Sequence, residues 1–522
     1  MSYGNSAMLK DFKHYIQRMQ TRHLIVPCTL GFLLFAILIL ARSDMWDGTI
    51  ISYASATGQF HGIRRLTADT DLDSVLILFR FEIFIAKFLH IGFLIVDRIV
   101  LVAAVVGICS LLHRMVRVQF RLSEQWSAFT IVLFLTFPIW HILASSTQTF
   151  YIVLLALGML GVDLVYRGKR NLMLLGFIVL LISFEMNSML TFAPALALVF
   201  EATQQDRRTI PRRLVGPFGI TVLGAAYWVA SRGLSQPSGH YANYNVITNP
   251  FSSNGWMVIK AGFENYSTFA LLPLLGIAVL TCLVTFFSSG DNRVRSPESG
   301  SFIPYSALLP LCFASVLPYI VVEKSTLVDD FDWYGRHAIP LSVPVTILVM
   351  LSTHFVFQQI KARGLYRILW KIVVVTLLIA PQSYILMHGL TMKMGRQDFE
   401  SQLIKALRTE QVKPGIVEIV GLPIFVPDFR VYEANYLMYR TFGEANWWTR
   451  IAPAEDPTFA VPDWIQRADY QEMYIYRPPQ LACRSIIQVS LANYGGFWDG
   501  VKSIVRLSTN SSVKITSVRS IC

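Results

Sequence analysis

Residues 91–112 read IGFLIVDRIVLVAAVVGICSLL, and residues 113–121 follow them directly as HRMVRVQFR. The first stretch is almost entirely apolar and is close in length to the ~20 helical residues that cross the hydrocarbon core of a bilayer. The second stretch is basic. Because basic links accumulate on the cytoplasmic side of membranes, the pair predicts a membrane helix that begins outside the cytoplasm and ends inside it.

Ten more apolar stretches predict further crossings. The composition agrees, since 54% of the residues are hydrophobic and 15% are charged, with a mean hydropathy of +0.49. The expected fold class is an α-helical polytopic membrane protein with about eleven transmembrane helices. Stretches 172–186 and 189–203 are short, and they form either one re-entrant hairpin or two tilted crossings. The others are 23–41, 126–143, 149–166, 214–231, 267–287, 303–322, 338–357 and 368–387.

The links between these stretches alternate between basic and carboxylate-bearing, which predicts the orientation. The basic links belong in the cytoplasm, and the other links and everything after His388 are then extracytoplasmic. These basic links also account for much of the net charge of +12, so we expect no nucleic-acid partner. Without a eukaryotic targeting signal, the expected location is the bacterial inner membrane. The basic links are 1–22, 113–121, 167–170, 207–213, 293–295 and 361–367.

The chain is expected to have three parts. Residues 1–22 form a cytoplasmic arm before an uncleaved signal anchor, and residues 23–390 form the transmembrane domain. Its first outer loop, 42–90, ends in an apolar stretch at 74–89 that is broken by charged residues, which predicts an interfacial helix. Residues 391–522 have mixed charge and short apolar runs, which predicts a small extracytoplasmic α/β or mainly β domain.

The clearest candidate for chemistry follows the first crossing. Asp44 and Asp47 are three residues apart, so they share a face at a helix end, and Trp46 beside them can partly exclude water. A carboxylate in such a place is a candidate general base. The alternative is that the two acids simply form the polar end of a membrane helix.

A second candidate precedes the tenth crossing. Arg336 and His337 are cations in an outer loop, where the orientation rule does not require them, and an Arg at the interface suits a phosphate. The alternative is that the Arg336 side chain reaches for the headgroup region and pairs locally with Asp332.

Other candidates have weaker support. Glu185 lies within or at the outer end of an apolar stretch, where an ionisable residue is costly; it is either functional or a paired helix-end carboxylate. Arg64, Arg65 and His240 lie in outer loops and are each more typical of ordinary loop surface. Neither a P-loop, a dinucleotide-binding glycine motif, an HExxH motif nor a GxSxG motif is present, so we expect no nucleotide cofactor and no metal.

The order of these features resembles the GT-C class of membrane glycosyltransferases. The shared features are a basic arm, one crossing, a long outer loop that opens with an acidic motif, many further crossings and a C-terminal outer domain. The resemblance implies transfer of a sugar from a polyprenyl-phosphate donor to a hydroxyl group of a glycan, lipid or protein acceptor on the outer face. It implies that Asp44 or Asp47 is the catalytic base, and that Arg336 and His337 bind the donor phosphate.

Two other functions fit the sequence. A transporter or lipid flippase would gather ionisable residues near the middle of the membrane, and Asp97, Arg98, Asp163 and Lys371 lie within or near apolar stretches. An O-antigen polymerase or ligase would also work at the outer face. Such enzymes usually carry an Arg- and His-rich site in one large late outer loop.

Overall fold

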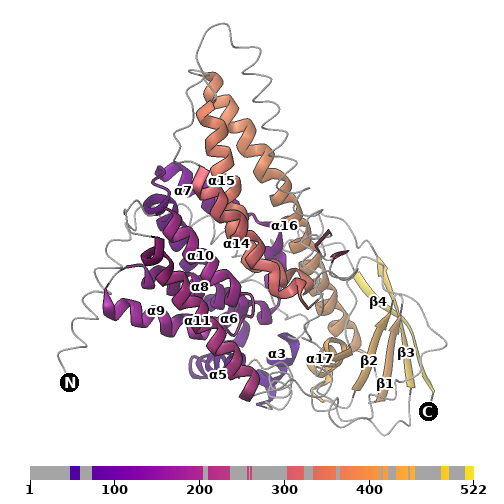
Figure 1. Cartoon of the computed structure of the whole chain (residues 1–522). Helices are drawn as coiled ribbons and strands as arrows, with labels where there is room; N and C mark the ends of the chain where they lie inside the picture. Colours follow the sequence, from indigo (N-terminus) through magenta and orange to yellow (C-terminus); the bar gives the residue numbers. More distant parts are fainter. Residues whose placement is uncertain are drawn as a thin grey trace.

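The computed structural model describes residues 48–58, 73–167, 169–203, 210–234, 256–257, 259–260, 302–322, 333–359, 365–410, 412, 415–420, 431–444, 447–452, 484–492 and 512–521 (Figure 1). Over this part of the chain the fold is mostly helical, with a four-stranded sheet near the C-terminus. The crossings predicted at 23–41 and 267–287 lie outside the described residues.

Three helical segments among the described residues are long and apolar enough to cross a membrane. The first is α6 (Phe93–Arg114) with the π-helical turn η2 (Met115–Gln119), and the second is α8 (Ser146–Val165). The third combines the end of the 3₁₀ helix η7 (Trp333–Leu341) with α15 (Ser342–Gln359). Each coincides closely with a predicted apolar stretch. The membrane-helix character is therefore confirmed, whereas the number of crossings stays a prediction.

Shorter apolar segments lie in α9 (Arg170–Ser183), α10 (Met189–Thr203), α11 (Ile210–Leu234) and α14 (Phe302–Ile320). One predicted helix differs from the structure, because the stretch 126–143 is broken. Its first part is α7 (Glu124–Leu135), and its second part is the 3₁₀ helix η3 (Pro138–Ala144). Pro138 has no N–H group to donate to the preceding turn, so the α-helix ends before it.

The contact between α8 and α9 is very close. A Cβ atom added to Gly176 would lie 2.8 Å from the carbonyl oxygen of Gly161 and 2.9 Å from the amide nitrogen of Val165. Only glycine permits this approach of the two backbones. Small residues at such contacts are typical of membrane proteins, where lipid tails are as apolar as leucine and packing drives helix association.

Among the described residues of the region expected to form the first outer loop, the structure has the helices α3 and α5. α3 (Gly48–Thr57) begins directly after Asp47, and its residues up to Ala54 are buried. α5 (Asp73–Phe88) covers the stretch expected to be an interfacial helix, and it has two different apolar faces. Phe79 is buried against the bundle, whereas Phe84 is 62% exposed. A helix is therefore confirmed there, and its place at the interface stays a prediction.

The C-terminal region begins with a long helix. α16 (Leu365–Leu407) runs without a break from the helical bundle to the sheet, so the predicted boundary at residue 390 falls inside a helix (Figure 1). The sheet has the strand order β2-β1-β3-β4, in which β1 pairs in parallel with β2 and β3, and β4 is antiparallel to β3. The strands are β1 (Gly415–Val420), β2 (Trp447–Ala452), β3 (Arg484–Ala492) and β4 (Ser512–Ile521), and α17 (Val431–Phe442) lies between β1 and β2 in the chain.

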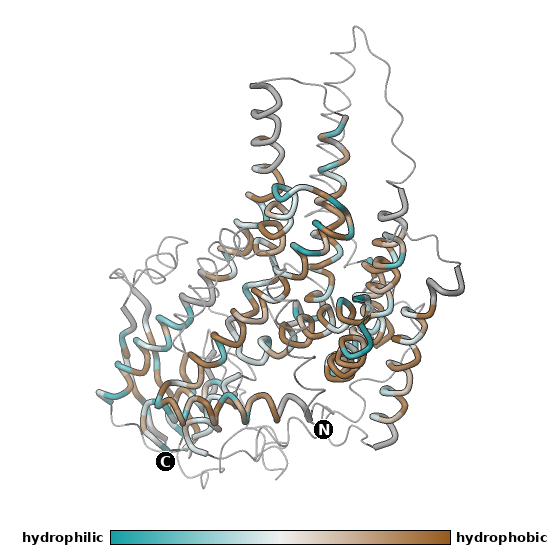
Figure 2. Tube along the Cα trace, turned by 90° about the vertical axis from the view of Figure 1, so that its left-hand side faces the viewer, coloured by the Kyte–Doolittle hydropathy of each residue, from teal (hydrophilic) through white to brown (hydrophobic). Residues whose placement is uncertain are grey.

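Within the described part of the chain, buried apolar side chains form two separate clusters. The larger one fills the helical bundle, whose helices are apolar along much of their length (Figure 2). The smaller one joins the end of α16, α17 and the sheet through residues such as Phe399, Leu437 and Ile487. The C-terminal region thus mixes helix and strand around a hydrophobic cluster of its own.

Candidate functional site

Of the residues singled out in the sequence, the structure describes Arg336, His337 and Glu185. Arg336 and His337 lie in η7 and are buried, with 7% and 2% of their surface exposed. The remaining candidates, Asp44, Asp47, Arg64, Arg65, His240 and Asp332, lie outside the described residues.

Arg336 and His337 are held in a fixed geometry. The Arg336 Nε–H group donates to Nε2 of His337 at 3.3 Å, and the His337 ring stacks on Tyr319 with centroids 4.4 Å apart and planes 27° apart. Tyr319 comes from the end of α14, which packs against η7. The His337 ring and the buried guanidinium hold each other in place, and a guanidinium suits a negatively charged ligand group.

The same η7 segment packs against η3 and α8, two elements that meet at Ser145. Ser145, Ser146, Gln148 and Thr149 are all buried at this junction. Within the described part of the chain, Oε1 of Gln148 and Oγ1 of Thr149 have no hydrogen-bond partner. The alternation of the links predicts that this turn lies on the outer side. The sequence did not mark these residues as candidates, because neutral polar residues at a helix start resemble ordinary caps.

A buried ion pair supports the junction from α6. Nη1 of Arg98 lies 3.2 Å from Oδ2 of Asp97 and donates to the carbonyl oxygen of Leu143 at 2.6 Å. Both charged side chains are fully buried. The pair therefore ties the start of α6 to the end of η3, directly before α8 begins.

A different group of charges lies at the opposite ends of α6 and α8. Nε of Arg114 is 3.0 Å from Oδ1 of Asp163, and Nη2 of Arg167 is 2.5 Å from Oδ2 of the same carboxylate. The group is a compact set of ion pairs between helix ends.

These contacts show whether the structure gathers the ionisable residues that a transporter would use. Arg98 pairs near the start of α6 and Arg114 near its end, which are separated by about 24 Å of helix at 1.5 Å per residue. The structure therefore does not bring Asp97 and Arg98 together with Asp163. The side chain of Lys371 lies outside the described residues.

Glu185 lies in the turn between α9 and α10 and is partly buried. Its Oε1 accepts a hydrogen bond of 2.6 Å from the hydroxyl group of Tyr227 on α11. This contact matches the second interpretation of Glu185, a helix-end carboxylate paired with a neighbouring helix.

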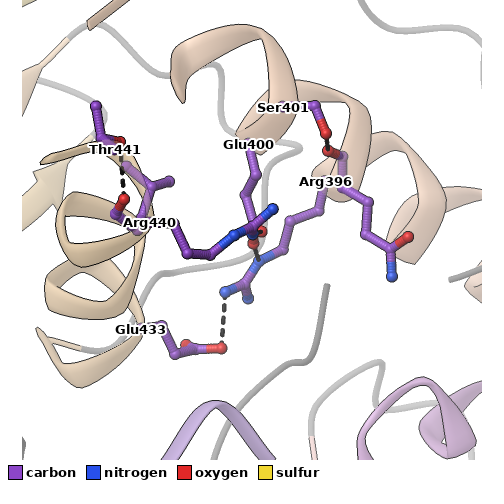
Figure 3. A network of polar contacts seen from close by, with 8 residues as sticks. Arg396, Glu400, Ser401, Glu433, Arg440 and Thr441 are labelled. Atoms are coloured by element: carbon purple, nitrogen blue, oxygen red, sulfur yellow. Dashed lines mark hydrogen bonds and ion pairs between the residues drawn. The ribbon is translucent and has the colours of Figure 1, made fainter. Parts of the chain in front are cut away.

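The C-terminal region holds a buried charged network that the sequence analysis missed (Figure 3). Arg396 on α16 contacts Glu433 on α17 at 2.7 Å and Glu400 at 3.3 Å, and Arg440 contacts the other oxygen of Glu400 at 3.3 Å. Two arginines face two glutamates, so the network is electrically balanced. The i, i+4 spacing of Arg396 and Glu400 was the available sequence signal. We interpret this network as the attachment of α17 to α16.

α17 also contacts the helix that follows the acidic motif. The Tyr53 ring of α3 makes edge contacts with the rings of Tyr439 and Tyr436, at centroid distances of 4.9 and 6.4 Å. α3 also packs against α6 and α8. Elements predicted to be extracytoplasmic therefore converge: α3 and α17 touch each other, α3 touches α6 and α8, and η7 touches η3 and α8.

Comparison with known proteins adds no identification, since the sequence matches no protein-family model and no curated protein. Among the described residues, no group of three or more His, Cys, Asp or Glu side chains is placed to hold a metal ion. The features that suggest a function are therefore the Arg336–His337 pair of η7 and the buried polar residues at the start of α8.

Proposed function

We propose that this protein is a membrane glycosyltransferase of the GT-C class. It transfers a sugar from a polyprenyl-phosphate donor to a hydroxyl group of a glycan, lipid or protein acceptor on the outer face of the bacterial inner membrane. The observation that carries the proposal is the buried Arg336–His337 pair of η7, which packs against α8, a helix that α3 also contacts. α3 begins directly after Asp47, which supports an acidic motif near this end.

The chemistry requires groups of opposite charge at one surface. A carboxylate, Asp44 or Asp47, takes the proton of the acceptor hydroxyl while the hydroxyl oxygen forms a bond to the sugar carbon. The bond between that carbon and the phosphate oxygen breaks, and Arg336 and His337 stabilise the negative charge on the departing phosphate. A general base contributes about 10²–10⁴-fold, and one well-placed donor to developing charge about 10²–10³-fold.

The chemistry of Arg336 also supports a phosphate ligand. A planar guanidinium can make two parallel contacts to phosphate oxygens, and a lipid-linked phosphate can reach a membrane surface from the bilayer. The wide separation of Asp97 and Arg98 from Asp163 gives no support to a transport pathway built on these residues.

The proposal is tested by replacing the acids singly, as Asp44→Asn and Asp47→Asn. At least one replacement should abolish sugar transfer from a polyprenyl-phosphate donor, because an amide cannot accept the proton. The measurement is the rate of product formation by purified full-length protein in lipid nanodiscs.

The matched control is Asp398→Asn on α16, a partly buried carboxylate that accepts a hydrogen bond of 2.8 Å from Gln402. It should leave transfer unchanged. Wild-type rates in both Asp44→Asn and Asp47→Asn would remove the proposed base and the proposal with it.

A further inference from the structure

One face of α5 exposes a row of large apolar side chains. Their spacing of i, i+4, i+7 and i+11 places them on the same side of the helix. Each is between 58% and 71% exposed, so the helical bundle leaves most of the row uncovered. The members of this apolar row are Ile77, Phe81, Phe84 and Phe88.

The opposite face of α5 is fixed to the bundle. Phe79, Ile83 and Ala86 are at most 2% exposed, and the Phe79 ring makes an edge contact with Phe93 of α6 at a centroid distance of 6.5 Å. Because this face already packs against protein, the apolar row cannot be buried by a rotation of the helix. An apolar surface of this kind is rarely left in water and marks contact with another molecule or with a membrane.

α5 is too short and too charged to cross the membrane itself. Its 16 residues span about 24 Å at 1.5 Å per residue, less than the ~30 Å of the hydrocarbon core. Arg80, Glu82 and Lys87 interrupt its sequence, and α5 is not among the described helices that are long and apolar enough to cross. The apolar row therefore suits the surface of a bilayer rather than its full depth.

The row leads directly to a membrane helix. A short turn joins α5 to α6, in which the N–H group of Ile91 donates to the carbonyl oxygen of Ala86 at 3.0 Å. Beyond Phe88, the exposed apolar side chains continue with Leu89 in the turn and with Ile95 and Ile99 at the start of α6, at 46% to 57% exposed. Since α6 is long and apolar enough to cross a membrane, lipid is the surrounding that both helices share.

The charges beside the row favour lipid headgroups as the partner. Lys87 is exposed, and within the described part of the chain it forms no ion pair. The acidic Glu82 of the same helix is fully buried instead. A second copy of α5 would bring another lysine to this face, whereas the phosphate of an anionic lipid would bring the opposite charge.

We propose that α5 binds the outer surface of the bilayer, with its apolar row among the acyl chains and Lys87 beside the phosphate of an anionic phospholipid. The sequence predicts only that this stretch lies at the interface, and the structure adds the face that enters the lipid and the cation that meets the headgroup. Nζ of Lys87 also lies beside Gly58 at the end of α3, 3.9 Å from the place of an added Cβ atom. The same anchor therefore holds the end of α3 near the membrane surface.

The first test measures the depth of the row in full-length protein in nanodiscs. The six cysteines are replaced by alanine, and a nitroxide label is attached to Phe84→Cys or Phe88→Cys. Electron paramagnetic resonance compares collisions with oxygen, which concentrates in the bilayer, and with a water-soluble nickel chelate. Both labels should favour oxygen strongly and lie about 5–10 Å below the headgroups.

Two further labels provide the references. Val222→Cys, at an exposed position of the apolar helix α11, represents lipid, and Lys405→Cys, at an exposed position of α16, represents water. Labels on α5 that match Lys405→Cys would overturn the proposal, because water would then cover the row. Protection from both oxygen and nickel would also overturn it, because a protein surface such as a second copy would then cover the row.

The second test uses the unmodified chain and examines the headgroup. Phosphatidylglycerol and phosphatidylcholine, each with a photoreactive diazirine in an acyl chain, are crosslinked to the protein at equal mole fraction, and mass spectrometry locates the products. Residues 77–88 should react with both lipids, and with phosphatidylglycerol about fivefold more, the preference expected for one lysine at a membrane surface.

Lys87→Gln should bring this ratio close to one while the row still reacts with lipid. The control is Arg117→Gln, an exposed arginine at the other end of α6, which should leave the ratio at α5 unchanged. Absence of crosslinks from residues 77–88 would overturn the anchor. A wild-type ratio near one, or an unchanged ratio in Lys87→Gln, would overturn the contact with the phosphate.

These results are independent of the proposed function. Protein that transfers no sugar from any polyprenyl-phosphate donor but crosslinks to lipid along the row would keep the anchor and lose the glycosyltransferase proposal. Active protein whose row lies in water would lose the anchor alone.

Discussion

Two of the buried polar clusters among the described residues are built in different ways. In the cluster between α16 and α17, Arg396 and Arg440 contact Glu400 and Glu433 at 2.7 to 3.3 Å (Figure 3). In the cluster at η7, Arg336 donates to His337, and the His337 ring stacks on Tyr319.

The difference separates an attachment from a site. A low-dielectric interior strengthens every hydrogen bond that is made and penalises every polar group that is left alone. A balanced network such as that of Arg396 holds helices in one arrangement and has little capacity for a ligand. The cluster at η7 is built from a guanidinium, an imidazole and a phenol ring, and its guanidinium N–H groups are well suited to an anion.

The largest expected effect comes from breaking the balanced network with Arg396→Ala. The change leaves the buried carboxylate of Glu433, which is 1% exposed, without its cation. Removing one partner of a buried pair costs about 3–5 kcal/mol in the free energy of unfolding. Denaturant unfolding of the full chain in detergent, followed by tryptophan fluorescence, measures the loss.

Two further variants make this prediction specific. Lys405→Ala is the control, because Lys405 is an exposed cation of the same helix and should change stability little. The double variant Arg396→Met, Glu433→Met should recover much of the lost stability, because both charges leave together. Normal stability of Arg396→Ala alone would contradict the interpretation of this cluster as an attachment.

The second prediction concerns the cluster at η7. Arg336→Ala should slow sugar transfer about 10²–10³-fold, equivalent to about 2.7–4 kcal/mol of transition-state stabilisation, and should impair use of the donor more than use of the acceptor. Arg336→Lys should recover activity only in part, since an ammonium group cannot make the bidentate contacts of a guanidinium. Initial rates at varied donor and acceptor concentrations separate the two effects.

Comparing Arg336→Ala with Arg396→Ala separates an effect on sugar transfer from an effect on stability. Arg336→Ala should destabilise the protein much less than Arg396→Ala, while Arg396→Ala in the folded fraction should retain transfer. Arg117→Ala, an exposed arginine at the end of η2, serves as the control for activity. Equal losses of donor and acceptor use in Arg336→Ala, together with a large loss of stability, would assign Arg336 to the folding of η7.

Hydropathy predicted the helices well where a helix is apolar along its whole length, because burial in lipid and burial in protein both favour apolar residues. The stretch 91–112 became α6 and 149–166 became α8, with shifts of only a few residues. It did not predict that α16 continues well beyond 387, because the helix outlasts its apolar part and hydropathy reports the surroundings of a helix rather than its length. Nor did it predict the break at Pro138, which local backbone chemistry decides.

The candidate site was predictable only in its charged members. Arg336 and His337 were conspicuous because cations are unexpected in an outer loop. Gln148 and Thr149 were not, since their importance depends on burial and on missing hydrogen-bond partners, which follow from the packing of η3 and η7 onto α8. Asp163 was conspicuous in the sequence because it is an acid near an apolar stretch. The structure explains it by ion pairs with two arginines.

The smallest expected effect tests where Glu185 belongs in this comparison. Tyr227→Phe removes the 2.6 Å hydrogen bond to its carboxylate, and we expect a loss of about 1 kcal/mol in stability, since Glu185 is only partly buried and water replaces much of the contact. Sugar transfer by the folded variant should stay unchanged, because a paired helix-end carboxylate has no part in the reaction. A loss of activity larger than the loss of stability would instead make Glu185 a member of the site, and the set of extracytoplasmic carboxylates to be tested beside Asp44 and Asp47 would then include it.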